Sequence, residues 1–111
     1  FQVRGMNMGT AVLLERTQEL LRHSVPGDQD MDTKVRQLIK AECMRQLARY
    51  RRVDINLNRK YGLTFADFLN QRIARKMDYS WEVEQDAMDW ETALGGIETV
   101  ERKLKELRPN P

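Results

Sequence analysis

Cysteine and histidine are almost absent from this chain of 111 residues, which contains only Cys43 and His23. A single cysteine cannot form an internal disulfide bond or a cysteine-based zinc site. A single histidine also argues against histidine-rich metal sites, and a catalytic triad would have only His23 to draw on. We therefore expect no metal ion and no other cofactor. The lone free cysteine indicates a reducing cytoplasm.

Glycine and proline are scarce as well, with six and three residues, which argues against a turn-rich all-β fold. No stretch approaches the roughly 20 consecutive apolar residues that a membrane-spanning helix needs. The chain is 41% hydrophobic and 32% charged, a balance typical of a globular protein. Phe1 and Gln2 resemble the remnant of an expression tag, so we expect residues 1–8 to be a disordered start and residues 9–111 to form one domain.

Charge is distributed unevenly, although the formal net charge is only +2. Residues 34–60 carry nine cations and two anions, a balance of +7. Residues 78–98 carry seven anions and no Lys or Arg, a balance of −7. Such blocks indicate an electrostatic contact, either between the two segments or with a partner.

The spacing of the apolar residues predicts an all-α fold. We expect two short and two long helices, at about residues 11–24, 31–61, 65–76 and 81–107. Suitable N-cap residues precede them: Thr10, Asp30 or Asp32, Thr64 and Ser80. Gly62 stands where a glycine commonly follows the last turn of a helix. The two long helices are expected to pack antiparallel in a small bundle whose ends are closed by the short ones.

Two positions interrupt these patterns. Asp54 stands at a position where the stripe of the second helix calls for an apolar residue. The neighbouring Val53 can only partly substitute for one. Gly95 and Gly96 lie inside the last helix, although each costs about 1 kcal/mol relative to Ala. Paired glycines in a helix indicate either a kink or a very close crossing by another helix.

The acidic stretch at the start of the last helix has three interpretations. Glu82, Asp86 and Asp89 lie three or four residues apart, so their carboxylates share one helix face and suit a hard cation. Helical di-metal sites usually add Glu-x-x-His ligands, however, and this stretch has no histidine. The other interpretations are a solvated surface and an electrostatic contact with the second helix or with a partner.

Arg45, Arg49 and Arg52 share one face of the second helix, and guanidinium groups suit phosphate. One interpretation is a surface that binds nucleic acid. No helix-turn-helix spacing or zinc ligands accompany these residues, however, and the net charge is low. We expect pairing with the acidic helix to neutralise much of this face, through ion pairs that each contribute little stability.

Arg16 and His23 have an Arg-x6-His spacing that is similar to that of helical ribonucleases of the HEPN superfamily. The spacing is loose, and both residues are expected on the exposed side of a short helix. We therefore predict a surface histidine near a helix end instead of a catalytic pair.

Trp81 and Trp90 are nine residues apart, so on one helix they point in roughly opposite directions. Both cannot face the same core. An exposed aromatic residue is a common feature of protein interfaces.

A longer pattern spans about residues 35–107. It consists of KYGLTFADF at 60–68, YSWEVEQD at 79–86, DWE at 89–91 and GIET at 96–99. This pattern is similar to that of small uncharacterised bacterial and archaeal proteins encoded beside toxin genes. The resemblance implies an antitoxin-like component of a prokaryotic toxin–antitoxin pair, and it brings no catalytic residues with it.

We therefore predict a non-enzymatic protein-interaction module, most concretely an antitoxin-like protein that binds and neutralises a small basic toxin. The partner is expected to dock on aromatic and acidic residues, because aromatics supply binding energy and unbalanced charge selects a basic partner. These residues are Tyr79, Trp81, Glu82, Glu84, Asp86, Asp89 and Trp90. The alternative is a nucleic-acid-binding protein that uses Arg45, Arg49 and Arg52. The long apolar stripes also predict a homodimer.

Overall fold

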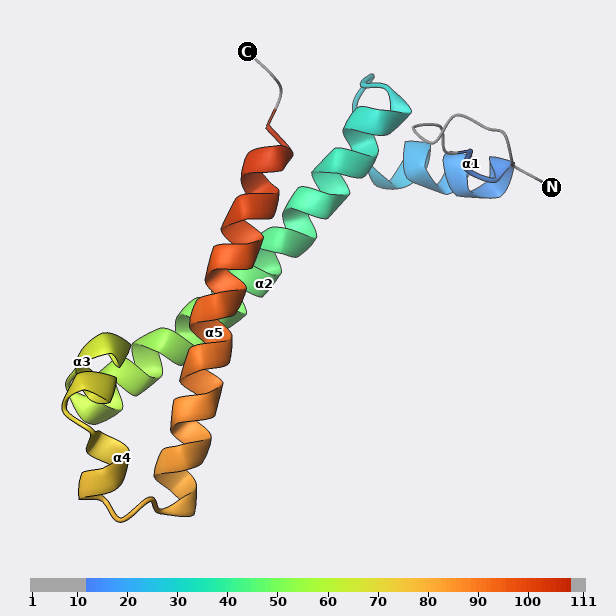
Figure 1. The fold of residues 1–111 in the computed structure, drawn as a ribbon. Coiled ribbons are helices and arrows are strands. Elements are labelled where there is room, and N and C mark those ends of the chain that lie inside the picture. Colours follow the sequence, from blue (N-terminus) through green and yellow to red (C-terminus); the bar gives the residue numbers. More distant parts are fainter. Residues whose placement is uncertain (1–11, 109–111) are drawn as a thin grey trace, which may run out of the picture. The chain divides into compact units, whose positions relative to one another are not determined.

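The computed structural model describes residues 12–108, which form five helices and no strand (Figure 1). The helices are α1 (Glu15–Ser24), α2 (Met31–Tyr61), α3 (Phe65–Asn70), α4 (Ile73–Lys76) and α5 (Trp81–Glu106). The predicted all-α class is confirmed for this part of the chain, and the two long helices end within one residue of their expected bounds. Residues 1–8, the expected tag remnant, lie outside the described residues. None of the five helices is long and apolar enough to cross a membrane.

The short helices differ from the prediction. α1 begins at Glu15 instead of residue 11, and its expected N-cap, Thr10, lies outside the described residues. The single helix expected over residues 65–76 is divided into α3 and α4. The division occurs at Arg72, which has φ of 52° and ψ of 48°. This left-handed backbone conformation cannot continue a right-handed helix.

Side-chain caps fix where three of the helices begin. Thr64 and Ser80 each accept a hydrogen bond from the backbone N–H three residues later, at 3.1 and 3.3 Å. At the start of α2, Asp30 accepts from the N–H three residues later at 2.8 Å, so it is the cap among the two predicted candidates. Each cap satisfies an N–H that the first helical turn leaves without a partner.

The chain divides into two compact units, and the boundary lies within α2 between Leu38 and Ile39. In the first unit, Leu21 of α1 and Lys34 of α2 are buried. Lys34 Nζ donates a hydrogen bond to the backbone carbonyl of Arg22 at 3.4 Å. A cation is favourable at this place because carbonyl groups in the last turn of a helix carry partial negative charge.

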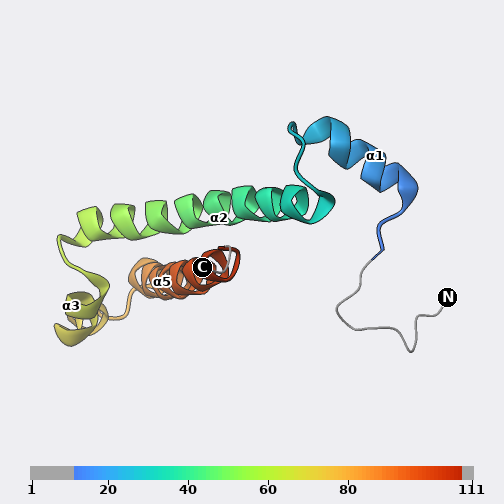
Figure 2. The same ribbon diagram turned by 90° about the horizontal axis from the view of Figure 1, so that it is seen from above.

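The second unit is built on the contact between α2 and α5, which lie side by side in both views (Figures 1 and 2). Three contacts follow in opposite order along the two helices: Lys60 with Glu82, Asp54 with Trp90, and Tyr50 with Gly96. Arg51 pairs with Glu101 nearby. A long pair of helices in contact is therefore confirmed. The more specific arrangement, a bundle closed at its ends by the short helices, stays a prediction.

The core of the second unit has two parts. The first lies beside α3 and contains four aromatic rings in contact, with ring centroids 5.0–6.1 Å apart: Tyr61, Phe65, Phe68 and Trp90. Trp90 and Phe68 are the largest fully buried side chains, at 0% and 1% exposure. The second part is formed by Cys43, Leu47 and Val100, so the single cysteine of the chain is a small core residue.

The two adjacent glycines of α5 have different surroundings. A Cβ atom added to Gly96 would lie 2.5 Å from the Tyr50 ring, far inside van der Waals contact. The ring of Tyr50 therefore lies against the backbone of α5 at Gly96, and the missing side chain leaves room for it. A very close crossing of the two helices themselves stays a prediction. A Cβ atom added to Gly95 would meet no heavy atom within 4 Å.

Candidate interaction surface

Two of the predicted partner-binding residues belong to a network that links α2 to α5. Lys60 donates hydrogen bonds to Glu82 and, at 2.6 Å, to Asp86. The hydroxyl of Tyr61 donates to the same Asp86 carboxylate at 2.6 Å. The Asp86 side chain is only 17% exposed. Asp86 therefore joins the two helices and offers little surface to a partner, whereas Glu82 keeps an exposed side chain.

The network shifts the pKa values of its members. Burial, together with the hydrogen bond to Asp86, raises the pKa of Tyr61 to about 12. Burial also acts to raise the pKa of Asp86, but the hydrogen bonds from Lys60 and Tyr61 outweigh it and leave this pKa below its ordinary value. The hydrogen bonds to Asp86 and Glu82 raise the pKa of Lys60. At neutral pH the network therefore consists of a carboxylate, an ammonium group and a neutral phenol.

Trp90 does not belong to the exposed surface, contrary to the prediction. Its side chain is completely buried, and its Nε1 donates a hydrogen bond to Asp54 Oδ1 at 2.8 Å. Trp81 is 76% exposed, so the two indoles point to different sides of α5 as expected. The reason for the correction is that the helix side carrying Trp90 faces α2 and α3.

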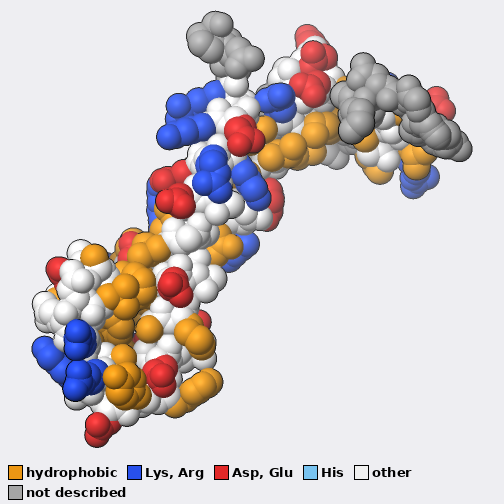
Figure 3. Space-filling model, viewed as in Figure 1, with side chains coloured by type: hydrophobic (Ala, Val, Ile, Leu, Met, Phe, Trp, Pro, Cys, Tyr) orange, Lys and Arg blue, Asp and Glu red, His pale blue; other side chains and the backbone are white. Residues whose placement is uncertain are grey.

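Exposed apolar residues surround the turn that leads into α5. Met77, Tyr79 and Trp81 are 50%, 58% and 76% exposed, and Met88 follows in α5 with 52%. Tyr79 and the preceding Asp78 both have positive φ, of 50° and 58°, which turns the chain from α4 into α5. Figure 3 shows hydrophobic side chains gathered on this end of the second unit, at the lower end of the view.

Two rows of residues cover the side of α5 that points away from α2. Trp81, Met88 and Gly95 recur every seven residues, which is close to two helical turns, so they form one row. A second row beside it contains three exposed acidic residues: Glu84, Glu91 and Glu98. Within residues 12–108, none of these three carboxylates forms an ion pair. We call these six residues the acidic face.

The sequence reasoning missed Met88, Glu91 and Glu98 as members of this face. Their seven-residue spacing is visible in the sequence. The sequence does not show, however, that Lys60 pairs with two of the neighbouring acids, whereas no described cation pairs with the outer row. Asp89, which was predicted, is exposed at the edge of the face and accepts a hydrogen bond from Gln85 at 2.9 Å.

Arg45, Arg49 and Arg52 lie on the side of α2 that points away from α5, and all three are exposed. Arg45 pairs with a glutamate one turn earlier at 2.9 Å, while Arg49 and Arg52 form no ion pair with the described residues. The expected neutralisation by the acidic helix is therefore wrong for these three residues. The ion pairs between the helices use Arg51 and Lys60, because these residues lie closer to α5.

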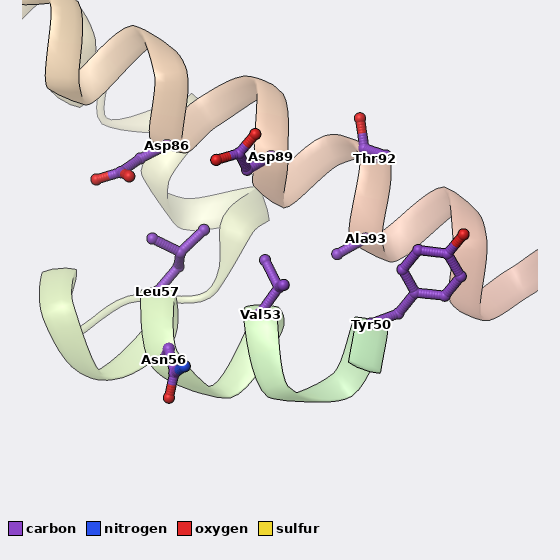
Figure 4. A pocket seen from close by; sticks show the side chains of 8 residues that line it. All are labelled: Tyr50, Val53, Asn56, Leu57, Asp86, Asp89, Thr92 and Ala93. Atoms are coloured by element: carbon purple, nitrogen blue, oxygen red, sulfur yellow. The ribbon is translucent and has the colours of Figure 1, made fainter. Parts of the chain in front are cut away.

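An open groove of about 380 Å³ lies between α2 and α5 (Figure 4). Its lining residues are Tyr50, Val53, Asn56, Leu57, Asp86, Asp89, Thr92 and Ala93. Val53 and Leu57 are directed toward α5, whereas Asn56 points away from the groove. The floor is therefore apolar, and the carboxylates stand along one side.

The pair with the HEPN-like spacing and the acidic residues considered for a metal ion all lie within the described residues. Arg16 and His23 are exposed on α1, and neither side chain forms a hydrogen bond within residues 12–108. In the same part of the chain, no group of three or more His, Cys, Asp or Glu is placed to hold a metal ion.

The sequence matches no model of a known protein family, and no significant match was found among curated proteins or solved structures. The resemblance to proteins encoded beside toxin genes therefore stays a prediction, and the function is argued from the exposed surfaces.

Proposed function

We propose that this chain is a non-enzymatic protein-interaction module and that a basic protein docks on the acidic face of α5. The observation that supports the proposal best is the 76% exposure of Trp81. Trp81 lies in one row with Met88, beside carboxylates that form no ion pair with residues 12–108. Covering apolar surface is favourable by roughly 25 cal/mol per Å². Exposed aromatics are therefore common anchors of protein interfaces.

The carboxylates determine which partner fits. Glu84, Glu91 and Glu98 are exposed along about four turns of α5, and their uncompensated charge attracts cations and repels acidic surfaces. Tyr79 and Asp89 lie at the edges of the same region and extend it. The proposed surface thus keeps Tyr79, Trp81, Glu84 and Asp89 of the predicted set. It leaves out Trp90, which is buried, and Glu82 and Asp86, which pair with Lys60.

The resemblance suggests the more specific form of this proposal, an antitoxin-like protein in a prokaryotic cytoplasm. A ribonuclease-type toxin must present cations to RNA, and a row of carboxylates would mimic phosphate groups and cover that site. In this form the chain would be a bundle built on two long antiparallel helices. It would also form a homodimer, which the long apolar stripes predict.

The experiment is to capture proteins from an extract of the source cells on the immobilised full chain. We expect a basic protein to be captured in a salt-sensitive manner. The double variant Trp81→Ala, Met88→Ala should lose it without a change in helical content. The matched control is Leu69→Ala, which removes a 54% exposed apolar side chain on α3. An identical set of captured proteins for all three chains would contradict the proposal.

Nucleic-acid binding is the second candidate, and one observation favours it. Arg49 and Arg52 are exposed and have no ion pair within the described residues, so their guanidinium groups are available for phosphate. Binding of a labelled duplex should then weaken steeply with salt and disappear when Arg45, Arg49 and Arg52 are changed to Glu. A chain that binds no duplex in low salt would remove this candidate.

A further inference from the structure

We propose that the partner of the acidic face is the outer side of α2 in a second copy of this chain. This inference rests on the proposed function, because it names the occupant of the same surface. It is based on the match between two seven-residue repeats, one on each long helix.

The repeat on α2 consists of a cationic row and a small apolar row. The cationic row contains Arg45, Arg52 and Arg59, which are all exposed. The apolar row beside it contains Ala41, Ala48 and Ile55, which are exposed as well. We call these six residues the Arg face. They point away from α5, because the inward positions of the helix are occupied by the buried Cys43, Leu47 and Leu57.

The charged rows meet when α5 of one copy lies parallel to α2 of another. On α5 each glutamate follows its apolar neighbour by three residues, whereas on α2 each arginine follows by four. A step of three residues and a step of four rotate a side chain in opposite senses around the helix axis. When two parallel helices face each other, the glutamates of one and the arginines of the other therefore lie on the same side of the contact. In this register the charged pairs are Glu84 with Arg45, Glu91 with Arg52, and Glu98 with Arg59.

The apolar rows are complementary in size in the same register. The pairs are Trp81 with Ala41, Met88 with Ala48, and Gly95 with Ile55. A large side chain thus faces a small one at each level, as close helix packing requires. The register also gives Gly95 a role. An interior helical glycine costs about 1 kcal/mol relative to Ala. No side chain of the described chain needs the space at Gly95, whereas Ile55 of a neighbouring copy would occupy it.

The contact joins two different surfaces, so one copy of a pair keeps a free Arg face and the other keeps a free acidic face. The acidic face and the Arg face lie on opposite outer sides of the contact between α2 and α5. Such a contact between unlike surfaces continues from copy to copy unless a ring closes. We therefore expect assemblies that grow with concentration beyond two copies and that dissociate as salt screens the charges.

The test uses sedimentation velocity of the full chain and two charge-reversal variants. The first variant is Arg45→Glu, Arg52→Glu, Arg59→Glu, and the second is Glu84→Lys, Glu91→Lys, Glu98→Lys. Each variant alone should associate at least ~10-fold more weakly than the original chain. An equimolar mixture should associate again, because each then meets a surface of opposite charge. The control Arg16→Glu, Arg75→Glu, Lys76→Glu makes the same charge change as the first variant outside both faces and should associate normally.

Several results would overturn the inference. The first is an original chain that stays monomeric at ~100 µM in low salt, where an association with a dissociation constant of even ~10⁻⁴ M would be visible. The second is a pair of variants that associate as the original chain does. The third is a mixture of the variants that stays monomeric although circular dichroism shows both to be helical. A monomeric chain that binds a labelled duplex through Arg45 and Arg52 would assign the Arg face to nucleic acid.

The failure of this inference and that of the proposed function are distinguishable. A monomeric chain that still captures a basic protein, and loses it in the Trp81 and Met88 double variant, overturns only the identity of the partner. A monomeric chain that captures nothing through Trp81 and Met88 overturns both.

Discussion

The indole of Trp90 and the carboxylate of Asp54, 36 residues apart in the sequence, are joined by a hydrogen bond of 2.8 Å. Asp54 is the polar residue that interrupts the apolar stripe of α2, and Trp90 is completely buried. A buried indole N–H usually finds an acceptor, because leaving it without one costs about 1–3 kcal/mol. The apparent interruption of the stripe is thus the residue that allows a tryptophan to occupy the core.

Replacing Asp54 should therefore destabilise the chain according to whether an acceptor remains. Asp54→Ala leaves the indole N–H without its acceptor, and we expect the free energy of unfolding to fall by about 1–3 kcal/mol. Asp54→Asn keeps a carbonyl oxygen and should lose less. Urea unfolding followed by circular dichroism measures both. Equal losses for the two variants would show that the hydrogen bond contributes nothing beyond the charge of Asp54.

The two glycines of α5 should respond to alanine with opposite signs. Gly95→Ala has free space and gains helix propensity, so stability should rise by up to about 1 kcal/mol. Gly96→Ala places a methyl group against the Tyr50 ring, and overpacking of this kind typically costs about 1–3 kcal/mol. Thermal unfolding of both variants in dilute solution measures the difference. A stabilising Gly96→Ala would show that the Tyr50 ring moves aside freely.

Replacing the two tryptophans should have very different effects on the free energy of unfolding. Trp90→Ala removes a fully buried side chain and should cost about 3–5 kcal/mol, whereas Trp81→Ala should change stability by no more than about 0.5 kcal/mol. Denaturant unfolding measures both losses. In addition, iodide should quench the fluorescence of the original chain but leave the remaining indole of Trp81→Phe shielded. Efficient quenching in that variant would contradict the burial of Trp90.

The network around Asp86 should make stability depend on pH at both ends of the scale. The pKa of Asp86 is lowered in the folded chain, so its contribution is present above the ordinary carboxyl pKa and is lost as pH falls through the folded value. The pKa of Tyr61 rises from 10.0 to about 12, so folding favours its protonated hydroxyl and stability falls as pH rises between these values. Unfolding experiments across pH measure both slopes.

Two variants assign these slopes to their residues. Asp86→Asn should remove its part of the acid slope, and Tyr61→Phe should remove its part of the alkaline slope. Glu84→Gln is the control for the acid limb, because Glu84 is exposed and forms no ion pair within the described residues. An unchanged acid slope in Asp86→Asn would mean that other carboxyl groups control the acid limb.

Elements with strong local signals could be predicted from the sequence. The long helix before Gly62 and the Thr64 and Ser80 caps depend on short-range chemistry, and all appear in the structure. The division of the third helix at Arg72 could not be predicted in this way. No glycine or proline marks that position, and a left-handed backbone is unusual for a residue that carries a side chain.

The candidate surface was predictable only in part, because the sequence does not show which acid meets which cation. Exposure of Trp81 and Glu84 followed from their helical positions. The burial of Trp90 depends on α3 and on Asp54, and the engagement of Asp86 depends on Lys60 and Tyr61. These contacts join residues that are more than 20 positions apart, so the spacing within one helix carries no information about them.

The contact between Tyr50 and Gly96 restricts which residues related sequences can carry at these two positions. A ring that lies where a Cβ atom would stand couples the two positions, so that neither can be exchanged independently for a bulkier residue. Homologues with alanine or serine at the position of Gly96 should carry a smaller residue than tyrosine at the position of Tyr50. The position of Gly95 should vary without regard to Tyr50. Covariation between two columns of an alignment would then mark the place where a side chain of α2 lies against the backbone of α5.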